Sequence, residues 1–434
     1  MPSAIANKSN NPTITIILAA AHHRTMPHRR VFAPLREPLR HDPQLQLQPD
    51  QVRGACPFLN PTHAIFMPII EAPQTEPPVA KEQQQQQGPS RAAHPNQIRY
   101  LWRSRDNRKG RHALQVQHHA LYALPRNTNG LRAVLAGLWR MATVFPYWDV
   151  SYLVAFIFTL GSVIWVINAF FVWLPLEDPS SEFSNESSTA GGVTAFVGAT
   201  VFEIGSILLV LEAVNENSAG CFGWALERVL RDQADELLDV LQPDNHACQH
   251  HHVNRRAFLS GRQQAITTSG RTFTWLPSWN ELRTHYMREL GFLASMAQLI
   301  GATIFWISGF TCLPGIINHM SQGLTDGVFW VPQIVGGSLF VISGLLFTIE
   351  TQKKWYIPAP HVLGWHIGIW NFIGGIGFTL CGSLGPASAN SGVDYESTLA
   401  TFWGSWAFLI GSIIQWYESL DKYPVETKKQ NFRS

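Results

Sequence analysis

The chain has 434 residues, a formal net charge of +2 and a hydrophobic content of 46%. A near-neutral charge without a compact basic domain argues against nucleic-acid binding, and five scattered cysteines indicate neither a disulfide framework nor a C-x-x-C metal site. Because nucleotide-binding, hydrolase and metalloprotease motifs are missing as well, we expect no enzymatic activity and no cofactor.

Residues 1–98 are polar and contain 15 of the 27 prolines. Such a segment buries too little apolar surface to offset its ordering entropy, so we predict a disordered tail. Residues 99–146 follow as a basic flank in which Asp106 is the single acidic residue. This charge is typical of the cytoplasmic side of a membrane, and contact with anionic headgroups is a second interpretation.

Six apolar segments of the remaining chain are long enough to cross a bilayer. They lie near residues 151–176, 192–210, 290–313, 328–349, 362–384 and 398–416. The loops after the first, third and fifth segments contain no lysine or arginine, whereas the N-terminal flank and the other connections are basic. The positive-inside rule therefore predicts an integral membrane protein with six spans and both termini in the cytoplasm.

The long connection of residues 215–289 is predicted to be cytoplasmic. Apolar residues recur at helical spacing over residues 224–241, which predicts an amphipathic helix. This helix either lies on the membrane surface or docks a protein partner. Ser278 and Glu281 have the spacing of a capping box, so a helix is expected to start there and run into the third span.

Two sequence motifs repeat three times. The even-numbered spans share a glycine, a phenylalanine, two small residues and a terminal glutamate, and the odd-numbered spans share small residues followed by an aromatic residue. We therefore predict an all-α membrane protein built from three helical hairpins in the same orientation, related by an axis along the membrane normal. The hairpins cover residues 147–214, 290–352 and 361–420, and residues 421–434 form a cytoplasmic tail.

Glu203 is the strongest candidate for a functional residue because an ionisable group within a span is costly and usually functional. We expect a polar transport path that includes Asn168 and Asn371, with His366 as a further neighbour of Glu203. The alternative is a structural carboxyl group that joins two helices by a hydrogen bond.

The terminal glutamates of the even-numbered motif, Glu212, Glu350 and Glu418, are expected at the cytoplasmic interface. Pairing with basic neighbours such as Lys353, Lys354 and Lys422 is the favoured interpretation, and a ring of ion-binding carboxylates is the alternative.

A second group of candidate ligands lies in the long connection and consists of His246, Cys248, His250 and His252. These are residue types that bind transition metals, but their spacing matches no standard zinc module. A solvated loop and a metal site both remain open.

The run at residues 301–309 and the segment 404–418 resemble multi-pass integral membrane proteins of filamentous fungi that have no assigned activity. The hairpin is also similar to the small YrhK-like membrane module. The resemblance covers about residues 145–423, and its packing motifs imply kinship without carrying over any site residue.

Two functions follow as expectations. The first is transport of ions or small solutes through the helical bundle. The second is a non-catalytic membrane scaffold or sensor whose Arg/His-rich loop binds a partner or a metal. The expected partner is the lipid bilayer, with no nucleic acid, and the sequence predicts no oligomeric state.

Overall fold

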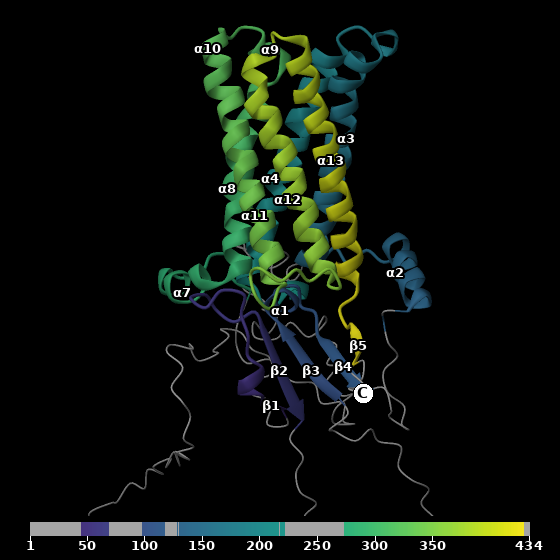
Figure 1. Cartoon of the computed structure of the whole chain (residues 1–434), viewed down its shortest axis with the longest axis vertical. Helices are drawn as coiled ribbons and strands as arrows, with labels where there is room; N and C mark the ends of the chain where they lie inside the picture. The colour runs from purple at the N-terminus through teal and green to yellow at the C-terminus, as the bar shows by residue number, and fades with distance from the viewer. Residues whose placement is uncertain are drawn as a thin grey trace, which may run out of the picture. The chain divides into compact units, whose positions relative to one another are not determined.

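A computed structural model describes residues 45–68, 98–117, 128, 130–216, 218–221 and 273–428. Among them, six helices are long and apolar enough to cross a membrane, as expected for a multi-pass integral membrane protein. They stand side by side in Figure 1. They are α3 (Val150–Glu177), α4 (Gly192–Val214), α8 (Leu290–Thr311), α11 (Val331–Glu350), α12 (Leu363–Leu384) and α13 (Ser391–Leu420).

Each of these helices packs against the next one in the chain, and α13 packs against α3, so the six helices form a closed ring. Side-chain caps mark the N-termini of α3 and α13. Asp149 accepts hydrogen bonds from the Ser151 and Tyr152 amides, and Asn390 accepts one from the Gly392 amide. Because of the Asn390 cap, α13 begins seven residues before the predicted span.

Six aromatic side chains, one from each helix, meet inside the ring and form what we call the aromatic layer. The closest two rings are those of Trp165 and Phe378, whose centroids are 4.9 Å apart. Most ring pairs in the layer meet edge to face. Small residues let the helices approach this closely, as at Gly375, where an added Cβ would lie 2.7 Å from the Val341 nitrogen. The layer consists of Trp165, Phe202, Phe305, Phe340, Phe378 and Phe408.

Short elements connect the long helices. Turns of π- or 3-10 type lead into or out of the spans, as at Glu186–Gly191 before α4 and Asp326–Trp330 before α11. The remaining short elements are Pro49–Gln51, Pro179–Ser181, Ala219–Cys221, Tyr286–Arg288, α9 (Pro314–Ile317), α10 (Gln322–Thr325) and Gly385–Ala387.

The described residues are mostly helical, as expected, but a five-stranded sheet that the expectation of an all-α protein did not include accompanies the helical ring. The strands are β1 (Leu45–Leu47), β2 (His63–Pro68), β3 (Ile98–Arg103), β4 (Ala113–Gln117) and β5 (Val425–Lys428), in the order β1-β2-β3-β4-β5. The first three pairs are antiparallel, and β4 pairs with β5 in parallel.

The strands lie in segments for which the sequence predicts none. Strands β1 and β2 lie within the segment that was expected to be a disordered tail, β3 and β4 lie mostly in the basic flank, and β5 lies in the C-terminal tail. Alternating apolar side chains explain this outcome, because Ala64, Phe66, Tyr100, Trp102, Leu114 and Val425 pack into one buried cluster.

The helix α2 (Leu131–Thr143) exposes a broad apolar face that includes Leu131, Leu135 and Trp139. Its Gly137 lies against Tyr417 of α13. An exposed apolar face of this kind is typical of a helix at a membrane surface. The amphipathic helix that we predicted over residues 224–241 lies outside the described residues.

The predicted capping box is present at the start of α7 (Trp279–Thr284). The Ser278 hydroxyl accepts a hydrogen bond from the Glu281 amide, and the Glu281 carboxylate accepts one from the Ser278 amide. However, α7 does not run into α8. The helix ends at Thr284, and the short turn Tyr286–Arg288 separates it from α8.

Candidate functional site

A short basic segment, residues 104–111, lies between strands β3 and β4 and contains the helix α1 (Ser104–Arg108). Gly110 has a φ of 61°, a conformation that glycine adopts without strain, and the chain reverses there. The Arg111 amide then donates to the Asp106 carbonyl at 2.7 Å. This compact turn leaves its cationic side chains buried, with none of them more than 7% exposed.

Each of the three motif glutamates receives a cation from the basic segment. Arg105 lies 2.7 Å from Glu418, and Lys109 lies 3.5 Å from Glu212. Arg108 donates two hydrogen bonds to the Glu350 carboxylate, at 2.7 and 3.0 Å. The three glutamates end α4, α11 and α13, so we call this the glutamate end of the bundle.

Asp106 and Arg111 complete the group. The Arg111 guanidinium lies 2.6 Å from Asp106 and 3.0 Å from Glu418. Four cations therefore face four carboxylates, and the buried charges balance. We call these eight residues the ion-pair layer: Arg105, Asp106, Arg108, Lys109, Arg111, Glu212, Glu350 and Glu418. A buried ion costs several kcal/mol unless it is paired, so the complete pairing is what permits this burial.

The expected partners of the glutamates do not take part. Lys422 lies instead 2.5 Å from Asp149 and donates to the Lys109 carbonyl, and Lys353 and Lys354 are exposed. The basic segment pairs with the glutamates because it connects β3 to β4 and this connection lies at the glutamate end of the bundle.

A cavity of about 30 Å³ lies between the aromatic layer and the ion-pair layer. Phe202 and Phe408 bound it on one side, and Arg105, Arg108 and Lys109 bound it on the other. A volume of about 10–15 Å³ suffices for one water molecule, so the cavity has room for about two. Its walls also carry three side-chain amides that have no hydrogen-bond partner among the described residues: Gln298, Asn371 and Gln415.

The other predicted transport residues do not join this cavity. Glu203 is half-buried on the outer side of the ring, where the exposed Thr303 hydroxyl donates to its Oε1 at 2.9 Å. Its Oε2 has no partner among the described residues. Glu203 follows Phe202, which faces the ring interior, and a rotation of about 100° per residue turns Glu203 outward.

Asn168 and His366 are also separated from Glu203. The Asn168 amide donates to the Gly191 carbonyl at 2.6 Å and to the Thr194 hydroxyl at 3.0 Å. His366 is near the surface and contacts the Pro360 carbonyl. The expected path through Glu203 and Asn168 is therefore not assembled, and of the predicted transport residues Asn371 alone lines the cavity.

Neither Gln298 nor Gln415 was predicted as a site residue, although a sequence pattern distinguishes Gln298. Gln298 and Asn371 each stand seven residues before the aromatic-layer residue of their own helix, Phe305 and Phe378. Two helical turns separate the positions, so both amides point to the same side as the aromatic rings.

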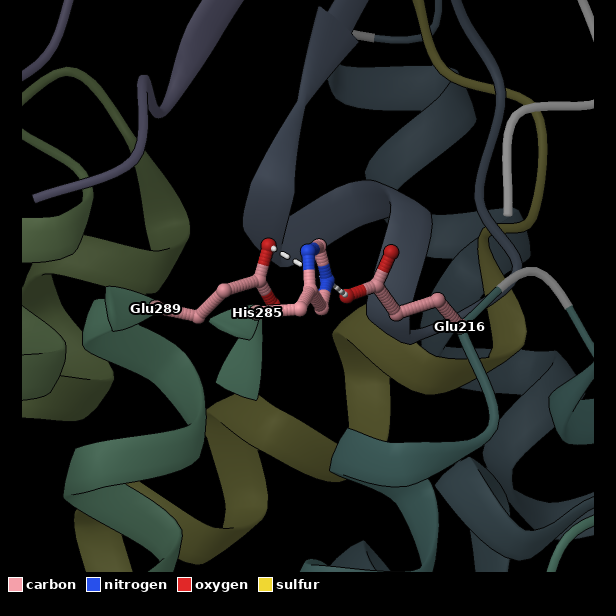
Figure 2. Close-up of side chains that lie close together, drawn as sticks. All are labelled: Glu216, His285 and Glu289. Atoms are coloured by element: carbon pink, nitrogen blue, oxygen red, sulfur yellow. Dashed lines mark hydrogen bonds and ion pairs between the residues drawn. The ribbon is translucent and has the colours of Figure 1, made fainter. Parts of the chain in front are cut away.

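A second polar cluster lies beside the basic segment. The side chains of Glu216, His285 and Glu289 point toward one another, with the imidazole between the carboxylates (Figure 2). His285 Nε2 is 3.4 Å from one oxygen of each glutamate. Asn107 of α1 donates to the other oxygen of Glu216 at 2.9 Å. We call this group the Glu–His–Glu cluster.

Burial, together with the neighbouring Glu216 carboxyl group, raises the pKa of Glu289 well above its ordinary value. Two carboxyl groups this close cannot both ionise without a compensating cation. The metal-ligand candidates of the sequence, His246, Cys248, His250 and His252, lie outside the described residues. The structure instead brings together residues at the two ends of the same connection.

Lys109 gives the ion-pair layer a pH dependence. Burial lowers the pKa of Lys109 to about 8, although the Glu212 carboxylate opposes this change. The unfolded chain keeps the ordinary pKa of 10.5 and therefore binds more protons than the folded chain between these values. Unfolding free energy is then expected to rise with pH between about 8 and 10.5 relative to a Lys109→Met variant. Unfolding measured over this range for both proteins would show a constant difference if Lys109 were not buried.

Comparisons of the chain with protein-family models, curated proteins and solved structures find no match. The resemblance to fungal multi-pass proteins and to the YrhK-like module stays a prediction, as does the absence of enzymatic activity. The basis for a function is therefore the chain's own geometry.

Proposed function

We propose that the six-helix ring is a gated conduit for small cations and that the basic segment, residues 104–111, closes its cytoplasmic end. The observation that carries this proposal is the cavity with its three unpartnered amides. Polar side chains in a membrane-spanning bundle are costly unless they face water or a partner, and they commonly mark a solute path. Gln298, Asn371 and Gln415 face the same small space.

Two barriers close the path in this conformation. The aromatic layer is an apolar constriction, and such constrictions gate channels by excluding water. The ion-pair layer is the second barrier, and it is removable because the basic segment is not part of the ring. Its movement would leave Glu212, Glu350 and Glu418 as three carboxylates at the mouth, and acidic rings of this kind favour cations.

The alternative is a static membrane scaffold. It is favoured by one observation, namely that the charges of the ion-pair layer are fully compensated while buried. In a scaffold, widening the aromatic layer would not change cation flux. Flux measurements therefore separate the two functions.

The test is cation flux into liposomes that contain the purified protein, followed with dyes for protons and K⁺. Phe408→Ala should raise the flux at least about tenfold, which corresponds to about 1.4 kcal/mol removed from the barrier. Phe402→Ala is the matched control, because Phe402 lies on the same helix but packs against Phe170 and Trp173 outside the aromatic layer.

Two further variants sharpen the result. In the Phe408→Ala background, Asn371→Leu should reduce the flux because it removes a polar group from the cavity wall. Glu203→Gln should leave it unchanged, because Glu203 lies off the path. A folded Phe408→Ala protein whose flux equals that of protein-free liposomes would reject the conduit and favour the scaffold.

A further inference from the structure

We propose that Glu216, His285 and Glu289 form a binding site for a first-row divalent metal ion, and that this ion is Zn²⁺. The proposal is independent of cation conduction. It rests on the identity of the three side chains, on the distances between their donor atoms and on their burial beside α1.

The distances match those of a metal site better than those of hydrogen bonds. Zn²⁺ holds nitrogen and oxygen ligands at about 2.0–2.1 Å in a tetrahedron, which places two ligand atoms about 3.3–3.4 Å apart. His285 Nε2 is 3.4 Å from Glu216 Oε1 and 3.4 Å from Glu289 Oε1. Good hydrogen bonds from nitrogen to oxygen are about 2.7–3.2 Å long, and a single N–H cannot point at both oxygens.

Each of the three residues offers one donor atom, and these three atoms lie within 4.8 Å of one another, so they can face a single ion. One imidazole and two carboxylates are a mixed set that suits Zn²⁺ or Mn²⁺, and a water molecule would fill the fourth position of a tetrahedral site.

The surroundings hold the ligands in place. Asn107 donates to the Glu216 oxygen that does not face His285, as outer-shell partners of metal ligands commonly do. The Asn60 side chain contacts the His285 carbonyl, and the Tyr286 hydroxyl donates to the Val214 carbonyl at 2.9 Å. A bound ion would therefore connect the end of α4, the start of α8 and the segment α1.

The test is Zn²⁺ binding to the full-length protein after chelation, measured by calorimetry and by thermal unfolding. We expect about one tightly bound ion per chain and a rise of about 5 °C in the midpoint at saturating Zn²⁺. Glu216→Gln and His285→Gln should each weaken binding by at least about 100-fold, and Asn107→Ala by about tenfold. The matched control is His319→Ala, because His319 is an exposed histidine between α8 and α11.

The loop histidines require their own control, because they could bind the ion instead. Joint replacement of His246, Cys248, His250 and His252 by alanine should leave the tight site intact. Co²⁺ provides a measurement that needs no variant, since a thiolate ligand such as Cys248 adds a strong charge-transfer band and the Glu–His–Glu cluster does not. Binding that is lost with the loop residues, a thiolate band, or no tight binding at all would overturn the proposal.

Discussion

Replacing Arg108 with alanine is expected to lower the unfolding free energy by about 3–5 kcal/mol, because one partner of a buried ion pair is removed while the others stay buried. Arg108 donates two hydrogen bonds to Glu350, lies 3.4 Å from Glu212, and has its guanidinium carbon 5.4 Å from the centroid of the Phe347 ring. Without it, Glu350 keeps a hydrogen bond from the Ser104 hydroxyl but loses its arginine. Unfolding in mixed detergent micelles would measure the loss.

The double variant Arg108→Met/Glu350→Met tests the physical reason. Removing both partners also removes the cost of burying an unpaired charge, so this protein should regain more than half of the lost stability. Lys354→Ala removes an exposed cation and should change the unfolding free energy by less than about 0.5 kcal/mol. An Arg108→Ala protein as stable as Lys354→Ala would show that the ion-pair layer does not form.

The six helices could be predicted because length and apolar composition alone determine a membrane span. The predicted span of residues 290–313 and the observed α8, Leu290–Thr311, differ by two residues at one end. The structure places Phe202 in the aromatic layer inside the ring. A rotation of about 100° per helical residue turns the next residue, Glu203, outward. The cost of a charge within the membrane predicts that a residue is functional, but it does not predict which way the side chain points.

The ion-pair layer could not be predicted from local patterns. Arg105, Arg108 and Lys109 look like a solvated basic flank when the sequence is read as a linear charge distribution. Their burial depends on β3 and β4, which direct the segment into the bundle end, and on glutamates more than 100 residues away. The parallel pairing of β5 with β4 is equally distant in sequence, and a strand of four residues carries almost no periodic pattern.

The structure also changes the meaning of the repeated glutamates. From the sequence, Glu212, Glu350 and Glu418 are three equivalent carboxylates near an interface. In the folded protein Arg105 pairs with Glu418, Arg108 contacts both Glu350 and Glu212, and Lys109 also contacts Glu212. All three cations come from one segment of five residues, 105–109. Movement of that single segment would therefore expose all three carboxylates together, which is the property that a gate requires.

Gly291→Ala is expected to lower the unfolding free energy by about 3–5 kcal/mol, although it adds a single methyl group. Gly291 lies in the first turn of α8, where an added Cβ would overlap the Arg108 guanidinium and lie 2.6 Å from Glu350 Oε1. The methyl group must displace the arginine, so the cost of overpacking adds to the cost of a broken buried ion pair. Because the basic segment closes the proposed conduit, cation flux should rise as well.

Substitutions at two other glycines serve as comparisons for the loss of stability. Gly364→Ala should also be destabilising, because its Cβ would lie 2.5 Å from Arg105 Nε, the cation that pairs with Glu418. Gly323→Ala in α10 meets no atom within 4 Å and should be neutral or stabilise by up to about 1 kcal/mol. If Gly291→Ala were as harmless as Gly323→Ala, Arg108 could not occupy the space beside α8, and neither the ion-pair layer nor its closure of the bundle would stand.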